Sequence, residues 1–257
     1  MSHTQLLNAL AAAEMEFAHF NAQRTSAAPE AVIAAGADPH FQWLTDASRP
    51  GSAYYCRAIA KRVADFPPSA LDRLPDSIAA VELRPAEIQP DLTDALLGAG
   101  FRPAGALCYL TMRPPAERLA VRHPVWRLDE TQVDRFLDLL ESAGTGFPPE
   151  RRAAKRHHYC TAGFQAFVAE DEQGRALGWS TVFRARDYAF LGNSYTLPEA
   201  RGQGVHAALL AARLNAAAQA GVEHIFTDVE HGSQSHANCE RLGLRTVTVN
   251  TIWHRRA

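Results

Sequence analysis

The sequence predicts an α/β (α+β) protein in which helices flank a mixed, mostly antiparallel sheet. Three observations predict this fold class: the order of strand-like and helix-like segments after residue 124, a glycine-rich turn between a strand and a long helix, and a weak internal repeat. The chain has 257 residues, of which 47% are hydrophobic, so it is long enough for one large domain or two small ones.

The predicted elements after residue 124 follow one another without long gaps. In chain order they are strand 125–128, helices 129–144 and 148–163, strands 164–170, 176–185 and 188–197, helix 202–221, strand 224–229, helix 233–243, and a closing strand or hairpin at 244–255. Asp129 is the expected N-cap of the first helix, and prolines open the second. Polar turns join the three central strands, so we expect them to form an antiparallel meander.

A weak internal repeat relates the two halves of the chain at an offset of 143 residues. Three pairs of identical residues carry it: Gly100 and Gly243, Arg102 and Arg245, and Glu87 and Glu230. Each copy is expected to contain a strand, a short helix, a glycine turn and a β-rich tail. The segment MRPPAERLAVRHP between them has the proline-rich composition of a boundary. We therefore predict domains at 1–115 and 124–257, joined by a linker at 116–123.

Composition and charge argue against several classes of partner. The net charge of −2 does not suit a protein that binds nucleic acid. The four cysteines are scattered, without a Cys-x-x-Cys pair, which favours a reducing compartment over a disulfide framework or a zinc site. The N-terminal segment has no basic leader, and no apolar run approaches the roughly 20 residues that span a bilayer. We expect a cytoplasmic protein without a membrane partner that can form a homodimer; the sequence does not specify its oligomeric state.

The segment TLPEARGQGVHAALL, residues 196–210, places two glycines at the start of a helix. A helix N-terminus leaves backbone N–H groups unpaired and carries a partial positive charge, and glycines let an anion approach it closely. Glycine beside a helix start is also ordinary loop chemistry, so the context has to decide. A P-loop is disfavoured because no Lys-Ser/Thr follows the glycines, and a dinucleotide fold because the glycines follow a meander.

Two motifs and the order of elements resemble the GCN5-related N-acetyltransferase (GNAT) superfamily over about residues 123–256. RGQGVHAAL, residues 201–209, is similar to the family's pyrophosphate loop. SQSHANCERLGLR, residues 233–245, is similar to the family's asparagine-containing helix and the turn after it. The resemblance implies two tandem GNAT-like domains.

The sequence departs from the family pattern at three positions. His206 stands where glycine or alanine is usual, Cys239 where many members have tyrosine, and Leu244 where phenylalanine is usual. The internal offset also places Arg201 on Ala58, in a stretch that has no glycine pair. We therefore expect residues 1–115 to form a degenerate GNAT-like domain that lacks the pyrophosphate loop.

The resemblance implies that the cosubstrate is acetyl-CoA. The amides at 203–206 would face its pyrophosphate, and the pantetheine arm would pair with free backbone groups at 195–197, where two strands splay apart. The implied binding residues are Tyr195, Thr196, Leu197, Arg201, Gly202, Gln203, Gly204, Val205, His206, Ser235 and Asn238. We expect no metal, because the adjacent His157 and His158 should point apart on a helix.

The implied activity is N-acetyltransfer, in which an amine attacks the acetyl thioester directly in a ternary complex. Glu230, at the end of a strand, is the candidate base, and a solvated strand-end glutamate is an equal alternative. Tyr195 and Cys239 compete for the role of acid, although a buried cysteine commonly serves as packing. The sequence does not specify the acceptor, a small-molecule or peptide amine. The alternative function is a non-catalytic acyl-CoA-binding sensor or regulatory protein.

Overall fold

The computed structural model describes residues 1–27, 32–63 and 65–256. These residues form two compact units. The first comprises Met1–Tyr109, Val229–His231 and Thr246–Ala257, and the second comprises Leu110–Asp228 and Gly232–Arg245. The units therefore do not follow a single cut in the chain, because the last strand belongs to the first unit. The predicted boundaries at 1–115 and 124–257 stay a prediction. No helix of the described residues is long and apolar enough to cross a membrane.

The first unit is built on a mixed sheet whose strands lie in the order β1-β2-β3-β4-β11-β5. Its elements are α1 (His3–Thr25), β1 (Ile33–Ala37), β2 (Phe41–Asp46), β3 (Arg57–Ala60), η2 (Pro68–Arg73), β4 (Ala80–Leu83), η3 (Pro85–Glu87), α2 (Pro90–Gly98), β5 (Phe101–Met112) and β11 (Arg245–Arg255). β3 and β4 are parallel, while β1 with β2, β2 with β3, and β4 with β11 are antiparallel.

Helices cover both faces of this sheet. α1 packs its alanines and Met15 on Leu44 and Ile59, and on the other side α2 and η2 pack with Phe41, Leu83 and Trp253. Because neighbouring residues of a strand point to opposite faces, β3 supplies Ile59 to one cluster and its flanking alanines to the other.

Buried charges also connect α1 to the strands. Arg57 on β3 forms ion pairs with Glu14 of α1 and with Glu82 of β4, and the Tyr109 hydroxyl donates to Glu82 at 2.6 Å. Although burial lowers it, the two carboxylates raise the pKa of Arg57 well above its usual value. The guanidinium therefore offsets part of the cost of burying two carboxylates, and the Tyr109 hydroxyl adds a hydrogen bond to one of them.

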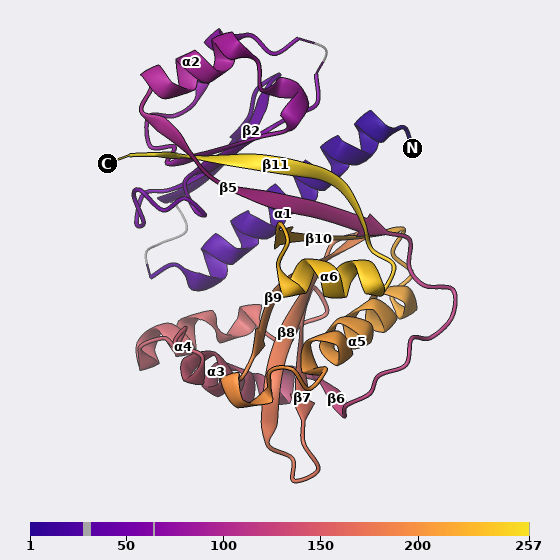
Figure 1. Ribbon diagram of the computed structural model, residues 1–257. Coiled ribbons are helices and arrows are strands. Elements are labelled where there is room, and N and C mark those ends of the chain that lie inside the picture. The colour runs from indigo at the N-terminus through magenta and orange to yellow at the C-terminus, as the bar shows by residue number, and fades with distance from the viewer. Residues whose placement is uncertain (28–31, 64, 257) are drawn as a thin grey trace. The chain divides into compact units, whose positions relative to one another are not determined.

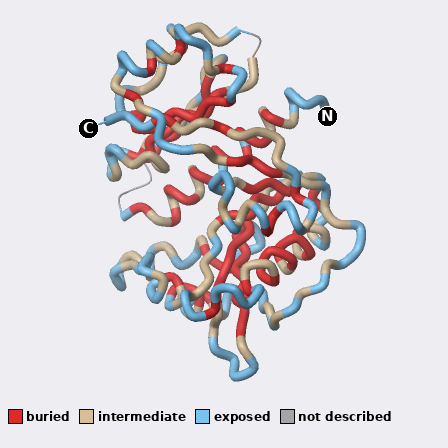
Figure 2. Tube along the Cα trace, viewed as in Figure 1, coloured by how far each residue is buried: buried red, intermediate tan, exposed pale blue. Residues whose placement is uncertain are grey.

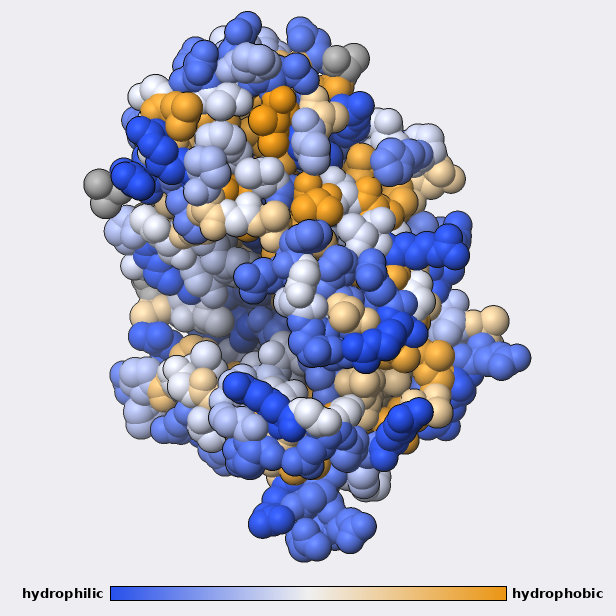
Figure 3. Space-filling model, in the orientation of Figure 1, coloured by the Kyte–Doolittle hydropathy of each residue, from blue (hydrophilic) through white to orange (hydrophobic). Residues whose placement is uncertain are grey.

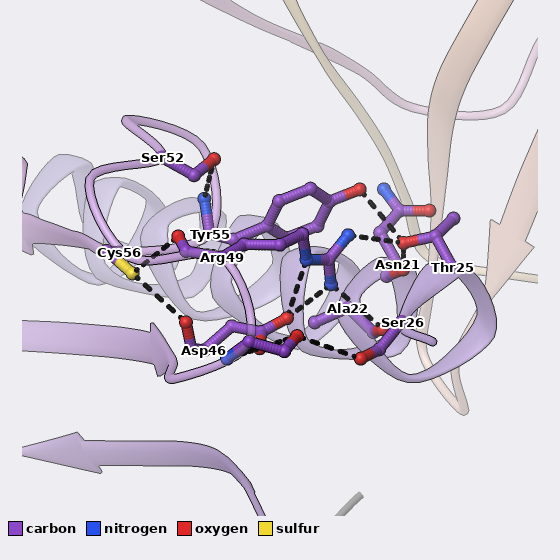
Figure 4. A network of polar contacts seen from close by, with 10 residues as sticks. Asn21, Ala22, Thr25, Ser26, Asp46, Arg49, Ser52, Tyr55 and Cys56 are labelled. Atoms are coloured by element: carbon purple, nitrogen blue, oxygen red, sulfur yellow. Dashed lines mark hydrogen bonds and ion pairs between the residues drawn. The ribbon is translucent and has the colours of Figure 1, made fainter. Parts of the chain in front are cut away.

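The C-terminal end of α1 is tied to the segment after β2 by Arg49 (Figure 4). The Arg49 guanidinium pairs with the buried Asp46 carboxylate at 2.5 Å and donates to the Thr25 hydroxyl and the Ala22 carbonyl at 2.8 and 3.1 Å. The Tyr55 ring lies 3.3 Å from it. Since a cation at the last carbonyls of a helix complements its dipole, this network fixes α1 on the sheet.

The second unit contains the predicted meander, with strands in the order β10-β9-β8-β7-β6 (Figure 1). Its elements are β6 (Val125–Leu128), η4 (Glu130–Gln132), α3 (Val133–Ser142), α4 (Pro149–Lys155), η5 (Arg156–His158), β7 (Phe164–Glu170), β8 (Ala176–Arg184), β9 (Tyr188–Thr196), η6 (Pro198–Ala200), α5 (Val205–Gln219), β10 (His224–Glu230) and α6 (Gln234–Arg241). β6 to β9 are antiparallel, and β10 is parallel to β9. The predicted fold class, mixed, mostly antiparallel and flanked by helices, is confirmed.

Two helices cover the two faces of this sheet. On one face, Val205 of α5 lies against Gly178, where an added Cβ would come within 3.3 Å of the Val205 side chain. On the opposite face, Phe136 of α3 meets Trp179 edge to face at 5.6 Å. All seven residues of β7 are buried, as the red core in Figure 2 illustrates, whereas the polar tip of the β7–β8 hairpin is strongly hydrophilic in Figure 3.

The predicted repeat corresponds to a shared run of elements. β4, α2, Gly100 and β5 follow one another in the first half, as β10, α6, Gly243 and β11 do in the second. Both glycines have positive φ, +85° and +95°, which glycine adopts readily between a helix and a strand. The turn between helix and strand, at Gly100 in the first half and at Gly243 in the second, is therefore the part of the repeat that the two halves share most clearly.

The second predicted helix, at 148–163, is shorter than expected. α4 ends at Lys155, and the 3₁₀ turn η5 follows it. The rings of His157 and His158 lie 4.0 Å apart, so the expectation that they point apart on an α-helix was wrong. Even so, no three His, Cys, Asp or Glu side chains within the described ranges could jointly hold a metal ion.

Candidate functional site

β9 and β10 part before either strand ends. Their parallel pairing covers three residue pairs, ending at Phe190 and Phe226, although β9 continues to Thr196. Just beyond this point, the Thr227 hydroxyl donates to the Leu191 carbonyl at 2.8 Å, so a side chain takes the place of the backbone partner. The edge of β9 beyond Leu191 is therefore released from β10.

The same part of β9 contains a β-bulge. Ser180 of β8 pairs with Ser194, but the next residue of β8, Thr181, pairs with Gly192. Asn193 is the extra residue and has a φ of +43°, and its buried Nδ2 atom makes no hydrogen bond to any described residue. A bulge bends its strand and re-aims the residues after it, here toward the glycine turn.

A cavity of about 500 Å³ lies where β9, the start of α5 and α6 meet. It is lined by Thr196, Ala200, Arg201, Gly202, Gly204, Val205, His206, Ala207, Gln234, Ser235, Asn238 and Arg241. The helix N-terminus and two arginine side chains make its wall electropositive, which suits an anionic ligand.

The glycine turn owes its shape to positive φ angles. Gly202 and Gly204 have φ of +77° and +84°, and Gly204 is the N-cap of α5 without a side-chain cap. The first residues of a helix lack intrahelical partners for their amides, so Val205, His206 and Ala207 offer donors at the cavity wall. His123 supports the turn from outside, with Nε2 2.7 Å from the Gln203 carbonyl.

The ring of His206 points from α5 toward α6. Its Nδ1 lies 2.9 Å from Nδ2 of Asn238 and its Nε2 lies 3.5 Å from the Ser235 hydroxyl. Burial, together with the Arg213 guanidinium, lowers the pKa of His206 to about 4. The imidazole is therefore neutral at pH 7, and its bare Nδ1 accepts from the Asn238 amide.

Cys239 lies on α6 beside this pair and is 2% exposed. Burial raises the pKa of its thiol to about 11, against the lowering effect of the Arg213 guanidinium. At pH 7 the group is a protonated thiol, able to give up a proton and poorly able to attack as a thiolate.

The two other predicted catalytic residues, Tyr195 and Glu230, differ in burial and in the unit to which they belong. Tyr195 is half-buried, and its ring stacks on Trp179 at 6.1 Å. Glu230 is the exposed last residue of β10, and the end of that strand, from Val229, is grouped with the first unit. The two side chains therefore belong to different units.

Eight of the eleven predicted cofactor residues line the cavity; Tyr195, Leu197 and Gln203 do not. The Leu197 amide already donates to the Leu177 carbonyl of β8. Sequence reasoning missed four lining residues: Ala200, Ala207, Gln234 and Arg241. Gln234 and Arg241 could have been found, because they lie four residues before and three after Asn238 and so share its helix face.

The family model of the acetyltransferase (GNAT) family matches residues 133–244. The chain therefore carries a GNAT-family domain, as the motifs predicted. The match begins at α3 and ends just after α6, so it contains every residue that lines the cavity.

Solved structures match over most of the chain. A GCN5-related N-acetyltransferase from Kribbella flavida matches with a TM-score of 0.60 at 15% identity, covering 95% of this chain and 96% of its own. One from Sphaerobacter thermophilus gives 0.59 at 12%, covering 97% and 93%. A tandem GNAT protein from the clavulanic acid biosynthesis pathway gives 0.50 at 12%, covering 83% and 77%. The fold is GNAT-like. No curated protein matches the sequence.

Proposed function

We propose that this protein is an acetyl-CoA-dependent N-acetyltransferase that moves an acetyl group to an amine by direct attack in a ternary complex. The observation that carries the proposal is the cavity of about 500 Å³ at the glycine turn, inside the GNAT-family domain. Its volume is in the range of pockets that hold small molecules and cofactors.

The residues present fit coenzyme A. The α5 amides at Val205 and His206 would bind the pyrophosphate, with Arg201 and Arg241 adding positive charge. A Cβ at Gly202 would meet no atom of the described residues within 4 Å, so there is open space beside the turn. The released edge of β9, from Leu191 toward Thr196, offers backbone groups to the pantetheine arm. Asn238, which is 8% exposed and bonded to His206 and Gln234, holds α6 against the turn.

The protein's own groups have two tasks in the reaction: orientation of the substrates and proton transfer. Binding both substrates side by side lowers the barrier by proximity. The Cys239 thiol, protonated at pH 7, is a candidate acid for the departing thiolate, and Tyr195 is its competitor. Glu230 stays the candidate base for the acceptor amine. The high pKa of Cys239 favours direct transfer over a covalent acetyl-cysteine.

The test is a panel of small-molecule and peptide amines incubated with acetyl-CoA, with release of free thiol followed over time. We expect at least one amine to give release above the rate without amine, together with an acetylated product by mass spectrometry. Binding of acetyl-CoA without turnover on any amine would instead support the acyl-CoA-binding sensor. Failure to bind acetyl-CoA would contradict both functions.

A further inference from the structure

A buried arginine on α5 connects the glycine-turn helix to the bulge in β9. Arg213 is 3% exposed, and its Nη1 donates to the carbonyl oxygens of Thr181 and Gly192, both at 3.3 Å. These two residues face each other across the shifted register. One guanidinium group therefore holds β8 and β9 together at the bulge.

Stability alone does not explain this arginine. Arg213 takes part in no ion pair among the described residues, and its buried Nε makes no hydrogen bond. Burial lowers its pKa to about 10, which still leaves the group charged at pH 7. Burying a charge that has no ionic partner costs desolvation free energy, so the burial of this guanidinium does not by itself stabilise the fold. What the guanidinium adds is a fixed position for two backbone carbonyls.

The Gly192 carbonyl is held from two sides. It also accepts from the Thr181 hydroxyl at 3.0 Å, while the preceding Leu191 carbonyl accepts from Thr227. The carbonyls of Leu191 and Gly192 are thus fixed at the point where β9 leaves β10. The edge beyond them, from Asn193 to Thr196, owes its direction to these bonds.

We propose that Arg213 is a positioning residue that aims the released edge of β9 at the pantetheine arm of coenzyme A. The proposal rests on the proposed function. Arg213 lies eight residues after Val205, or about 12 Å along α5, so one rigid helix joins the phosphate-binding turn to the bulge. The helix therefore sets the distance between the part of the protein that holds the pyrophosphate and the part that holds the pantetheine arm.

Two ligands distinguish a role of Arg213 in binding the pantetheine arm from a role in stabilising the fold as a whole. Acetyl-CoA has both the nucleotide and the pantetheine arm, whereas 3′-phospho-ADP is the nucleotide without the arm. Calorimetry gives the dissociation constant of each for the wild type, Arg213→Met and Arg213→Lys. Arg186→Met is the control, because Arg186 is exposed in the turn between β8 and β9.

For Arg213→Met we expect acetyl-CoA to bind at least about tenfold more weakly, a loss comparable to one hydrogen bond, and 3′-phospho-ADP to bind unchanged within about threefold. Arg213→Lys should fall between, because one ammonium cannot span both carbonyls as well. Amide hydrogen exchange at residues 192–196 should speed up in ligand-free Arg213→Met, while the α5 amides stay protected. Arg186→Met should resemble the wild type in each measurement.

Equal weakening of both ligands would overturn the proposal, because Arg213 would then serve the fold as a whole. Unchanged binding of both ligands, or unchanged exchange at residues 192–196, would overturn it as well. If wild-type protein binds neither ligand, the proposed function fails, and the exchange measurement still decides whether Arg213 fixes the bulge.

Discussion

Asn215 on α5 holds the backbone of Leu119 at two points. Its Oδ1 accepts from the Leu119 amide at 2.8 Å and its Nδ2 donates to the Leu119 carbonyl at 2.9 Å. Asn215 is 7% exposed, so the amide is nearly shielded from water. The segment that its composition marks as a linker is therefore fastened to the helix of the glycine turn.

Asn215→Leu should release this segment. The loss of two hydrogen bonds should lower the free energy of unfolding by about 1–3 kcal/mol and speed tryptic cleavage after Arg118 and Arg122. Limited proteolysis followed by mass spectrometry measures this. The control is Gln219→Leu, one helical turn later, where the side chain makes no hydrogen bond in the described part of the chain. Equal cleavage of the two variants would show that Asn215 does not fasten the segment.

His206 should make stability depend on pH. Its pKa of about 4 in the folded protein is below the ordinary 6.5, so its contribution is present above pH 6.5 and is lost as pH falls toward 4, where the unfolded chain binds the extra proton. Between pH 7 and pH 4, the free energy of unfolding of the wild-type protein should fall by roughly 3 kcal/mol more than that of His206→Gln. Urea unfolding of both proteins at several pH values gives the two slopes, and parallel slopes would refute a buried neutral imidazole.

Cys239→Ala should keep measurable acetyl transfer, about tenfold slower if the thiol protonates the leaving group. A thiol with a pKa of about 11 is a poor nucleophile at pH 7. Wild-type protein mixed with acetyl-CoA alone should therefore gain no acetyl group by mass spectrometry. An acetylated wild type, together with a folded but inactive Cys239→Ala that still binds acetyl-CoA, would establish a double-displacement enzyme.

Arg57→Met should destabilise the first unit strongly. Removing the cation takes away the positive charge that the buried Glu14 and Glu82 carboxylates share, and breaking a buried ion pair typically costs about 3–5 kcal/mol. Chemical denaturation measures the loss. The triple variant with Glu14→Gln and Glu82→Gln should recover much of it, because no unpaired charge remains. A cost below about 1 kcal/mol for Arg57→Met alone would mean that water reaches the carboxylates.

Local signals account for most of the second unit. The strands at 125–128 and 164–170 were predicted with the bounds that the structure gives them, because polar turns and β-branched or aromatic runs delimit them. The glycine turn was found because its residues differ from ordinary helix formers. That Ser235 and Asn238 belong to the same site was implied only by the resemblance of the second motif to the GNAT family.

Pairings between distant residues could not be predicted in this way. β11 has the composition of any closing strand, yet it pairs with β4, about 170 residues earlier. Local composition does not specify this partner, because strand pairing depends on side-chain packing between segments that are distant in the sequence. Arg213 also escaped notice. An arginine in a long helix is ordinarily a solvated residue, and only the carbonyls of the bulge make its burial favourable.

The most direct test of the account is calorimetric titration of the whole chain with acetyl-CoA, in the wild type, Gly204→Asp and Gly174→Asp. Both glycines have positive φ, +84° and +76°, so the two substitutions carry similar backbone strain, but Gly174 lies in the β7–β8 turn, away from the cavity. We expect one binding site in the wild type and in Gly174→Asp, and no measurable binding in Gly204→Asp, because the new carboxylate would repel the pyrophosphate. Two sites per chain, or binding that survives Gly204→Asp, would contradict it.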